Sequence, residues 1–380
     1  MTADGISDQS SPNETRAFER MCVVGAGAWG TALASTVAQA GVSTCIWARS
    51  DAVVSDINEN HANSLYLPNV SLPANLSATF DLENALAGAD AVMIVVPSTA
   101  IRSVAGDVAR YIAPGIPVAI CAKGVEAQTG MLMAQVGHQE LGDRPIGCVS
   151  GPTFARETAL RHPTAAVVAF PFGYEDRLRP HQSAAARFAV SLTTESFRAY
   201  VSDDLTGVEV GGAVKNVIAI ACGMMTGAGF AENTRAALIT RGLDEMKRLA
   251  LALGGHAETI SGLSGVGDLS LTCSTPTSRN MALGLQLGEG LKRENCFGGR
   301  PVVVEGECNA QSVTDLARRV GVEMPICETV HSILHGGADI GTAFAALWAR
   351  PIEAEPSAML FSLNHPASDE DIQGLARRIA

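Results

Sequence analysis

Short apolar runs alternate with helix-like segments through the first half of the chain. Seven runs rich in apolar residues predict strands at 21–24, 43–47, 91–96, 116–122, 146–149, 164–169 and 193–200. The run at 91–96 is continuous and ends at Pro97, as expected for a strand buried on both faces. Helices are predicted at 29–40, 51–60 and 81–87, with a loop rich in Pro and Asn at 65–75. This alternation predicts a parallel, doubly wound sheet.

Helical periodicity replaces the alternation after about residue 203. Apolar residues between 239 and 253 recur every three or four positions, and Gly254 and Gly255 follow as a stop signal. Further helical stretches are predicted at 281–287, 310–320 and 328–334. We therefore expect the second half of the chain to be all-helical.

The pattern divides the chain into four parts. Residues 1–18 are polar and lack the apolar region of a signal peptide, so we expect a flexible tail. Residues 19–203 form the sheet domain, 204–350 the helical domain, and 351–380 a C-terminal extension without a clear signal. The long apolar stretch from 211 to 230 contains Lys215, and we expect a buried helix there and no membrane span.

Charge and composition narrow the possible partners. The 380 residues have a formal net charge of −12, which argues against a nucleic-acid partner because phosphate backbones are bound by clustered Lys and Arg. A small anionic ligand is compatible with this charge, since a few local basic groups can hold one phosphate. The nine cysteines contain no C-x-x-C pair, which indicates a reducing compartment, the cytoplasm, and no disulfide framework. No Cys and His cluster has zinc-ligand spacing, so we expect no metal.

A glycine-rich segment, Gly25-Ala26-Gly27-Ala28-Trp29-Gly30, follows the first predicted strand and opens the first predicted helix. In this G-x-G-x-x-G pattern the first Gly allows a tight turn, the second lets a pyrophosphate approach the backbone, and the third lets the helix pack closely on the strand. Free N–H groups at the helix N-terminus then face the phosphates. A structural glycine turn is the alternative, but the position in a β-α-β unit favours a dinucleotide site. We therefore expect a Rossmann-type domain followed by an all-helical C-terminal domain.

The end of the second predicted strand bears on the choice of dinucleotide. NAD-binding proteins usually place Asp or Glu there for the ribose hydroxyls, whereas this chain has Arg49. Arg49 could meet the 2′-phosphate of NADP or could be a solvated surface side chain, and Asp51 keeps NAD possible. We expect NADP(H), NAD(H) or both, with NADPH favoured.

A single lysine, Lys215, interrupts the apolar run 211–222. Burying a lysine is costly unless it is paired. Desolvation would lower the pKa of Lys215 and suit it for general acid–base chemistry near neutrality. The alternative is that the aliphatic stem lets the ammonium group reach the surface.

Three other places offer polar groups that could act with this lysine. Asp268 lies in the Gly-rich turn 265–269, where it could pair with Lys215 or only cap a turn or helix. The segment Ser278-Arg279-Asn280 precedes a predicted helix and forms either an anion site or a plain helix cap. Lys123 follows the strand 116–122 at the edge where α/β sheets bind ligands, unless it is a solvated loop residue.

Together these segments resemble the soluble NAD(P)-dependent glycerol-3-phosphate dehydrogenases. The similarity spans about residues 22–350 and is carried, in the family's order, by the segments 25–30, 123–124, 150–155, 211–217, 265–269, 278–280 and 304–306. The run Gly-Gly-Ala-Val-Lys-Asn-Val is the most diagnostic, since it separates this family from other dehydrogenases with a helical second domain. Ala122 is a departure, because the family normally has Ser or Thr before the Lys-Gly pair.

The resemblance implies a cytoplasmic homodimer that reversibly reduces dihydroxyacetone phosphate to sn-glycerol 3-phosphate for glycerophospholipid synthesis. It implies that Lys215 is the general acid/base and that Arg279 and Asn280 hold the substrate phosphate. The positions it places at the substrate are Lys123, Gly151, Thr153, Lys215, Asp268, Ser278, Arg279 and Asn280. The positions it places at the cofactor are Gly25, Gly27, Ala28, Trp29, Gly30, Arg49, Lys123, Ala155, Arg279, Val303 and Glu305.

Two other interpretations of the sequence are open. A related NADPH-dependent reductase of 2-oxo acids, such as a ketopantoate reductase or a hydroxyacid dehydrogenase, would share the two-domain plan and the helix lysine but would not need 278–280 as a phosphate site. A non-catalytic NAD(P)H sensor would keep the glycine loop but has no reason to hold Lys215 and Asp268 in an apolar setting. No basic recognition helix supports a repressor-type sensor.

Overall fold

An eight-stranded sheet forms the centre of the N-terminal unit in the computed structural model, which describes residues 15–353 and 362–379. The strands lie in the order β10-β9-β8-β7-β6-β1-β2-β5. Their bounds are β1 (Arg20–Val24), β2 (Ser43–Trp47), β5 (Leu76–Thr79), β6 (Ala91–Ile94), β7 (Val118–Ile120), β8 (Ile146–Ser150), β9 (Thr164–Ala169) and β10 (Phe197–Ser202). From β5 to β8 every neighbouring pair is parallel, as the alternating pattern predicts.

The prediction of a wholly parallel sheet is wrong at one edge of the sheet. β9 pairs antiparallel with β8, and β10 pairs parallel with β9. The connection from β8 to β9, residues 151–163, contains only the five-residue helix α6 (Ala155–Ala159), which packs on α1 and is too short to serve as the crossover helix that usually joins parallel strands. The chain therefore turns back beside β8. The predicted loop at 65–75 also contains a strand, β4 (Leu67–Ser71), which pairs with β3 (Ala62–Asn63).

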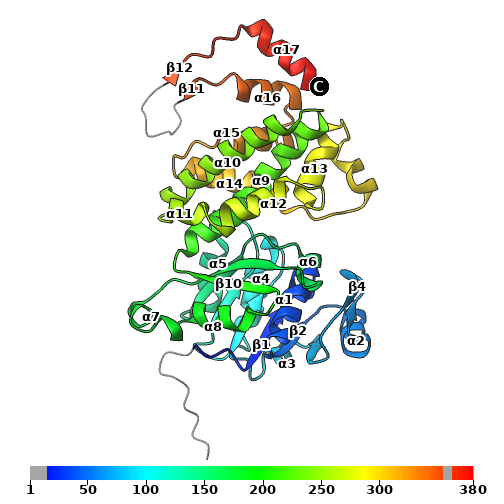
Figure 1. The fold of residues 1–380 in the computed structure, drawn as a ribbon, viewed down its shortest axis with the longest axis vertical. Helices are drawn as coiled ribbons and strands as arrows, with labels where there is room; N and C mark the ends of the chain where they lie inside the picture. Colours follow the sequence, from blue (N-terminus) through cyan, green and yellow to red (C-terminus); the bar gives the residue numbers. More distant parts are fainter. Residues whose placement is uncertain (1–14, 354–361, 380) are drawn as a thin grey trace, which may run out of the picture.

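Helices cover both faces of the sheet (Figure 1). Their bounds are α1 (Ala28–Gln39), α2 (Asp51–Asn60), α3 (Leu82–Leu86), α4 (Ile101–Ala109), α5 (Met133–Leu141), α7 (Tyr174–Leu178) and α8 (Ala184–Leu192), with short 3-10 turns η1 (Ser98–Ala100) and η2 (Pro180–Gln182). Side chains alternate across β1: Met21 and Val23 enter the core shared with α1 and α8, and Cys22 and Val24 enter the core shared with α4 and α5. This two-sided burial explains why the strands are apolar throughout.

The described end of the predicted tail packs onto this domain. Phe18 is buried, its ring lies 4.9 Å from that of Phe188, and the guanidinium of Arg187 lies 4.0 Å from the Phe18 ring centre. Most of the predicted tail, residues 1–14, lies outside the described residues.

The helical unit is built around α9 (Leu205–Gly227), which is buried over nearly all its length. The surrounding elements are α10 (Glu232–Ala252), α11 (Ala257–Ile260), the π-turn η3 (Leu263–Gly267), α12 (Asp268–Cys273), α13 (Arg279–Gly288), η4 (Arg293–Gly299), α14 (Glu305–Arg319), α15 (Pro325–Leu334) and α16 (Ile340–Trp348). A Cβ at Gly223 would collide with the carbonyl of Met281, so glycine lets α9 and α13 cross at close range. By length and composition α9 could cross a membrane, but here it is enclosed by protein, as predicted for a core helix.

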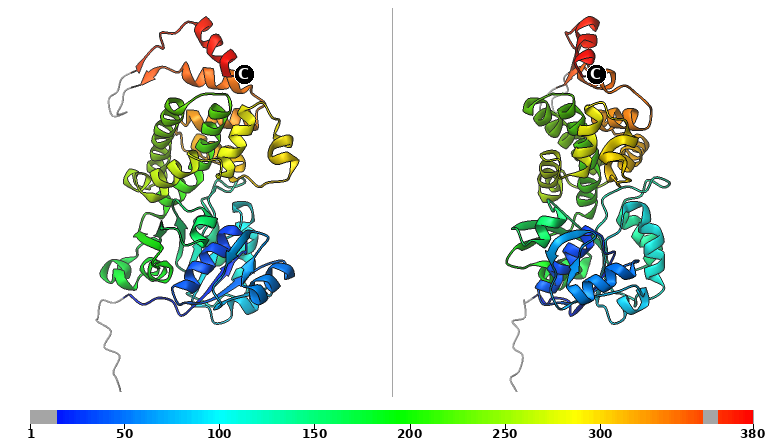
Figure 2. Two further views of the ribbon diagram at one scale, coloured as in Figure 1. Left: turned by 45° about the vertical axis from the view of Figure 1, so that its right-hand side comes forward. Right: turned by 90° about the vertical axis from the view of Figure 1, so that its right-hand side faces the viewer.

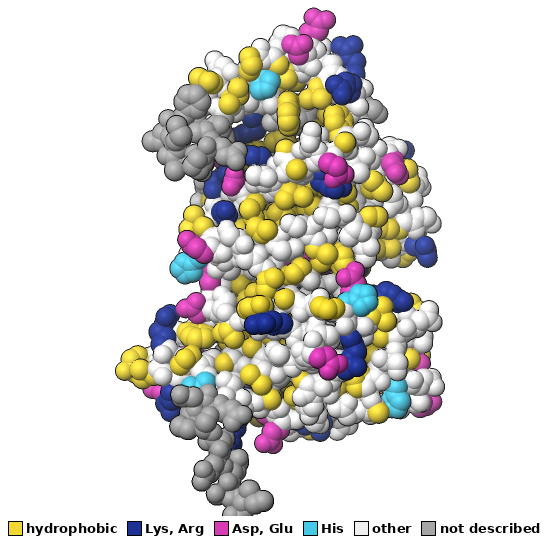
Figure 3. Space-filling model, viewed as in Figure 1, with side chains coloured by type: hydrophobic (Ala, Val, Ile, Leu, Met, Phe, Trp, Pro, Cys, Tyr) yellow, Lys and Arg dark blue, Asp and Glu magenta, His cyan; other side chains and the backbone are white. Residues whose placement is uncertain are grey.

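The C-terminal extension continues from α16 and packs on the helical unit (Figure 2). Its described elements are β11 (Ile352–Glu353), β12 (Ser362–Leu363) and α17 (Asp369–Ile379). Ile379 is buried, and the guanidinium of Arg378 lies 5.8 Å from the ring centre of Phe230. On the face drawn in Figure 3, Lys and Arg side chains are scattered among acidic and apolar ones without a continuous basic patch.

One buried carboxyl group links two helices of this unit. Glu245 of α10 accepts hydrogen bonds from the backbone N–H groups of Ile326, at 2.6 Å, and Cys327, at 3.2 Å, in the first turn of α15. Burial raises the pKa of Glu245 to about 7, although these N–H groups favour the charged form. Because the pKa of Glu245 in the folded protein lies above its ordinary value, the protonated carboxyl group contributes to stability. That contribution is complete at low pH and is lost as the pH rises through about 7.

Replacing Glu245 with Gln should therefore weaken the pH dependence of stability. The unfolding free energy of the unmodified protein should fall between about pH 5 and pH 8, because Glu245 loses its proton. In Glu245→Gln this fall should be smaller by about 1 to 3 kcal/mol. Chemical denaturation at the two pH values measures this. Glu289→Gln, at the exposed end of α13, is the matched control and should behave like the unmodified protein. A Glu245→Gln profile parallel to that of the control would contradict the expectation.

Candidate functional site

The glycine loop between β1 and α1 has the geometry that a dinucleotide requires. Gly25 has a φ of +118°, and a Cβ there would collide with the carbonyl of Val95 at the end of β6. A Cβ at Gly30 would collide with the carbonyl of Gly25, whereas a Cβ at Gly27 would meet no atom within 4 Å. The fold therefore requires glycine at 25 and 30. At 27 the protein leaves open space in front of the α1 N-terminus, where a pyrophosphate would lie.

A buried amide, which the sequence analysis did not identify, supports this loop. Asn63 of β3 donates from Nδ2 to the carbonyl of Ala26, at 3.0 Å, and to Oγ1 of Thr31, at 2.8 Å. Its side chain is fully buried. Asn63 lies just before the segment predicted as a loop, so the sequence pattern did not distinguish it from a turn residue.

The other predicted cofactor positions come from both units. Ala28 begins α1, and Ala155 begins α6, which packs against α1. The indole Nε1 of Trp29 is buried without a hydrogen-bond partner among the described residues. Val303 is 58% exposed, and it precedes Glu305 at the start of α14.

Arg49 follows β2 and is exposed to solvent. Within residues 15–353 and 362–379 it makes no hydrogen bond or ion pair. Its guanidinium is therefore available to an anion beyond the end of β2.

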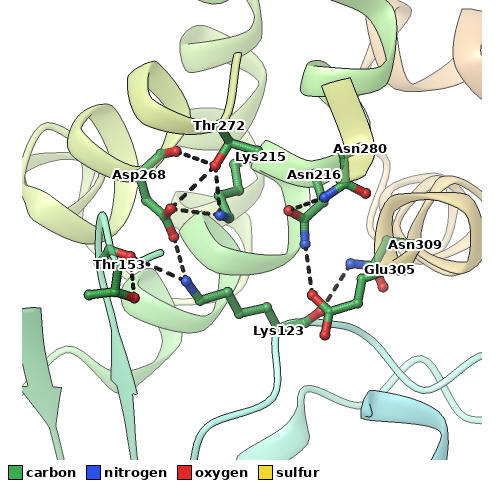
Figure 4. Close-up of polar contacts among 10 residues, drawn as sticks. Lys123, Thr153, Lys215, Asn216, Asp268, Thr272, Asn280, Glu305 and Asn309 are labelled. Carbon is green, nitrogen blue, oxygen red and sulfur yellow. Dashed lines mark hydrogen bonds and ion pairs between the residues drawn. The ribbon is translucent and has the colours of Figure 1, made fainter. Parts of the chain in front are cut away.

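Lys215 lies on α9 with its ammonium group inside the protein (Figure 4). It is 6% exposed, so the alternative of an ammonium group that reaches the surface is wrong. Nζ donates to Oδ1 of Asp268 at 2.6 Å and to Oγ1 of Thr272 at 2.8 Å. Thr272, one turn after Asp268 on α12, was not identified from the sequence.

Asp268 joins this helix lysine to a second lysine from the sheet domain. Its other carboxylate oxygen, Oδ2, accepts from Nζ of Lys123 at 2.6 Å. Lys123 follows β7 and also donates to the carbonyl of Gly151 at 3.3 Å. The same carbonyl accepts from Oγ1 of Thr153 at 3.2 Å. Lys123, Gly151 and Thr153 are thus brought together with Asp268, and one buried carboxylate bridges the two units.

The charges of this cluster shift one another's pKa values. Burial lowers the pKa of Lys215, Asp268 raises it and Lys123 lowers it, and the result is about 8. Burial alone would raise the pKa of Asp268, but the ammonium groups of Lys123 and Lys215 hold it below its usual value. At neutral pH the cluster therefore contains an ionised carboxylate and a Lys215 that can both give and take a proton.

The two glycines before Lys215 explain how these groups come so close. A Cβ at Gly211 would lie 2.6 Å from the carbonyl oxygen of Ser264, in the η3 turn that leads into Asp268. A Cβ at Gly212 would lie 3.2 Å from Cγ of Lys123. Gly211 thus lets the turn approach α9, and Gly212 lets the stem of Lys123 lie across the helix.

The predicted anion segment divides into residues with different surroundings. Ser278 caps α13 by accepting from the N–H of Met281 at 3.3 Å. Arg279 is exposed and makes no hydrogen bond or ion pair with any residue in the described parts of the chain. Asn280 is buried and donates to Oδ1 of Asn216 at 2.8 Å. The free charge at this place is therefore that of Arg279.

Asn216, the residue after Lys215, begins a network of side-chain amides that reaches α14. Asn216 was not identified from the sequence as a site residue. Its Nδ2 donates to Oε2 of Glu305 at 3.3 Å. Oδ1 of Asn280 accepts from the N–H of Gly306 at 2.9 Å. This network connects α9, α13 and the start of α14 beside the lysines. Among the described residues, no group of three or more His, Cys, Asp and Glu side chains is arranged to hold a metal ion.

Two family models match the chain. One is described as NAD-dependent glycerol-3-phosphate dehydrogenase N-terminus and matches residues 20–172; the other is the C-terminus of the same family and matches residues 204–345. A glycerol-3-phosphate dehydrogenase [NAD(P)+] from Parvibaculum lavamentivorans is 47% identical over 90% of this chain and 99% of its own length. The enzyme of the same name from Rhodospirillum rubrum is 46% identical over 89% of this chain and 94% of its own length.

The solved structures agree with these matches. The glycerol-3-phosphate dehydrogenase of Coxiella burnetii has a TM-score of 0.79 and 37% identity, and the similarity covers 89% of this chain and all of that one. A ketopantoate reductase of Ralstonia eutropha has a TM-score of 0.52 and 18% identity over 83% of this chain and 97% of that one, which shows a shared fold alone.

The glycine loop allows a test that separates folding from dinucleotide binding. Gly27→Ala should fold with an unchanged Tm, because the protein leaves room for the Cβ, but should weaken NADPH binding by about tenfold or more, because the methyl group would occupy the space where we expect the pyrophosphate. Gly25→Ala should lower the Tm as well, because of its positive φ and the clash with Val95. Thermal melts and fluorescence titration measure the two effects. Full NADPH affinity in a folded Gly27→Ala protein would refute the assignment of the loop.

Proposed function

This chain belongs to the NAD-dependent glycerol-3-phosphate dehydrogenase family, and we propose that Lys215 is the acid–base group of its reaction. The enzyme is an NAD(P)-dependent oxidoreductase that reversibly reduces dihydroxyacetone phosphate to sn-glycerol 3-phosphate, a reaction of lipid metabolism. The observation that supports the proposal is the buried Lys215–Asp268–Lys123 cluster, with Nζ–Oδ distances of 2.6 Å on both sides.

Lys215 would move one proton in each turnover. When bound, the nicotinamide supplies a hydride to C2 of dihydroxyacetone phosphate, and Lys215 Nζ–H donates a proton to the C2 oxygen as negative charge develops on it. In the reverse direction the neutral amine of Lys215 takes the hydroxyl proton. Asp268 and Thr272 hold the ammonium group in place through their hydrogen bonds. Lys123 and its neighbours Gly151 and Thr153 would border the substrate from the sheet domain.

Arg279 would bind the substrate phosphate. Its guanidinium is exposed and has no partner among the described residues, which suits bidentate contact with phosphate oxygens, and Arg279 lies in the first turn of α13, where helix N–H groups favour an anion. Asn280 would contribute with its backbone N–H, because its side chain is occupied by Asn216. Ser278 caps the helix that presents these groups.

The residues present fit a dinucleotide at the glycine loop, because Gly27 leaves a space that a Cβ would fill. Gly25, Gly27 and Gly30 would hold the pyrophosphate, with Ala28 and Trp29 in the first turn of α1. Further contacts are proposed for Lys123, Ala155, Arg279, Val303 and Glu305. Arg49, which has no partner among the described residues, supports a preference for NADPH, because its guanidinium would bind the 2′-phosphate of that cofactor. We also propose a cytoplasmic location, since all nine cysteines are free thiols, as expected in a reducing compartment. A homodimer is proposed from the family resemblance alone.

The proposed role of Lys215 predicts a loss of activity in a Lys215 variant and a pH dependence of the reduction rate. Lys215→Ala should lower kcat for dihydroxyacetone phosphate by about a thousandfold or more, because the proton donor and its charge are both lost. In the unmodified enzyme reduction should decline as the pH rises through about 8, where Lys215 loses its proton. Asp268→Asn should move this decline to lower pH, because the carboxylate raises the pKa of Lys215. Initial rates of NADPH oxidation measure these effects.

The control for this experiment is Lys292→Ala, an exposed lysine after α13, which should keep full activity. Full turnover by Lys215→Ala would reject the catalytic assignment. The same assay with NADH and with 2-oxo acids in place of dihydroxyacetone phosphate compares the two cofactors and the alternative substrates.

The preference for NADPH depends on Arg49. Arg49→Ala should weaken NADPH binding by about tenfold or more and leave NADH binding within about twofold, because only NADPH has the 2′-phosphate. Arg110→Ala, which removes another exposed arginine of the same domain, should change neither. Unchanged NADPH affinity in Arg49→Ala would reject the hypothesis.

A further inference from the structure

We propose that Asn309 positions both lysines of the site by holding their backbone segments with a single side-chain amide. The inference rests on the proposed roles of Lys123 and Lys215, and it adds a residue to which the proposed function assigns no contact with the substrate or the cofactor. Asn309 lies about one turn into α14, beside Glu305, and its amide faces the backbone of Lys123 (Figure 4).

The amide of Asn309 joins three segments that are far apart in the sequence. Nδ2 donates one hydrogen bond to the backbone carbonyl of Lys123 at 3.1 Å and another to that of Ala213 at 3.1 Å. Asn309 itself is 1% exposed. Because both hydrogens belong to one planar amide, they fix the distance and the angle between the two carbonyls.

These two carbonyls are the attachment points of the catalytic cluster. Ala213 precedes Lys215 by two residues on the rigid helix α9, and the Lys123 carbonyl belongs to the lysine itself. The tips of both lysines are held by Asp268, but a lysine stem has several rotatable bonds, so a contact at the tip leaves the base of the chain free to move. Asn309 holds the bases, and Asp268 holds the tips.

The packing around Asn309 indicates that the residue is present for the two N–H groups of its side-chain amide. A Cβ at Gly124, the residue after Lys123, would lie 2.9 Å from Oδ1 of Asn309 and 2.8 Å from Oγ of Ser98. Glycine at 124 therefore lets the loop lie directly on the amide. Oδ1 of Asn309 is buried without a partner among the described residues, which is unfavourable. An apolar side chain would avoid this penalty but would lose both N–H bonds.

Loss of these bonds should be visible in the protonation of Lys215. The charged or titratable groups that influence Lys215 are Asp268 and Cys273 on α12, Lys123 from the sheet domain and Glu305 on α14. Lys123 is the cation among them, and it lowers the pKa of Lys215. If the Lys123 loop withdraws, this repulsion falls and Asp268 interacts with Lys215 alone. Both changes raise the pKa of Lys215.

The test is a pH profile of reduction with Asn309→Leu, which keeps similar size and removes the donors. We expect kcat/KM for dihydroxyacetone phosphate to fall by about tenfold or more, and the alkaline decline to move up by about half a pH unit or more. Asn309→Thr keeps one donor, so its kcat/KM and its alkaline decline should lie between those of Asn309→Leu and those of the unmodified enzyme. In a Lys123→Met background, Asn309→Leu should no longer move the decline, because the repelling charge is already absent.

The matched control is Ser312→Ala, one turn further along α14, which removes a buried hydroxyl that has no partner in the described structure. It should leave both the rate and the pH profile unchanged. A folded Asn309→Leu enzyme with the unmodified rate and profile would overturn the proposal, and Asn309→Thr decides in the same way if Asn309→Leu does not fold. Failure of the proposed function would appear separately, as activity retained by Lys215→Ala.

Discussion

The carboxylate of Asp268, buried between two ammonium groups, is the interaction on which the rest of the site depends. A single buried charge of this kind is strongly unfavourable unless it is paired and hydrogen-bonded. Here each oxygen accepts from a different lysine at 2.6 Å, and the two lysines would repel each other without it. One lysine comes from the sheet domain and the other from α9, so the same carboxylate also links the two units.

The chain builds this cluster from a rigid helix and from close backbone approaches. α9 is enclosed by other helices, which fixes Lys215 in an environment that disfavours its charge. Gly211 and Gly212 remove the side chains that would keep Asp268 and Lys123 away. The result is a lysine whose pKa of about 8 suits proton transfer near neutrality.

The residues of the site that the sequence predicted are those that stand out from their neighbours along the chain. A lysine in an apolar run, a G-x-G-x-x-G turn after a strand and an acid in a glycine turn each have a physical cost or a backbone requirement that is visible in the sequence. Thr272, Asn216, Asn63 and Asn309 have no such signal, since polar residues in helices and turns are common. Asn309 and Lys123 are 186 positions apart, and only the folded chain brings them together. The antiparallel β9 was missed for the same kind of reason, because strand direction at a sheet edge depends on the connection and not on the apolar pattern.

Direct titration of the Lys215 side chain tests the central claim most closely. Heteronuclear NMR of Lys-labelled enzyme, with Lys215→Arg used to assign the signal, follows the Cε and Nζ resonances as the pH is raised. The buried pairing with Asp268 and Lys123 predicts a midpoint near 8 for Lys215. A midpoint at the ordinary lysine value of 10.5 would contradict the account, because it would mean that Lys215 is solvated or lies apart from the second ammonium group.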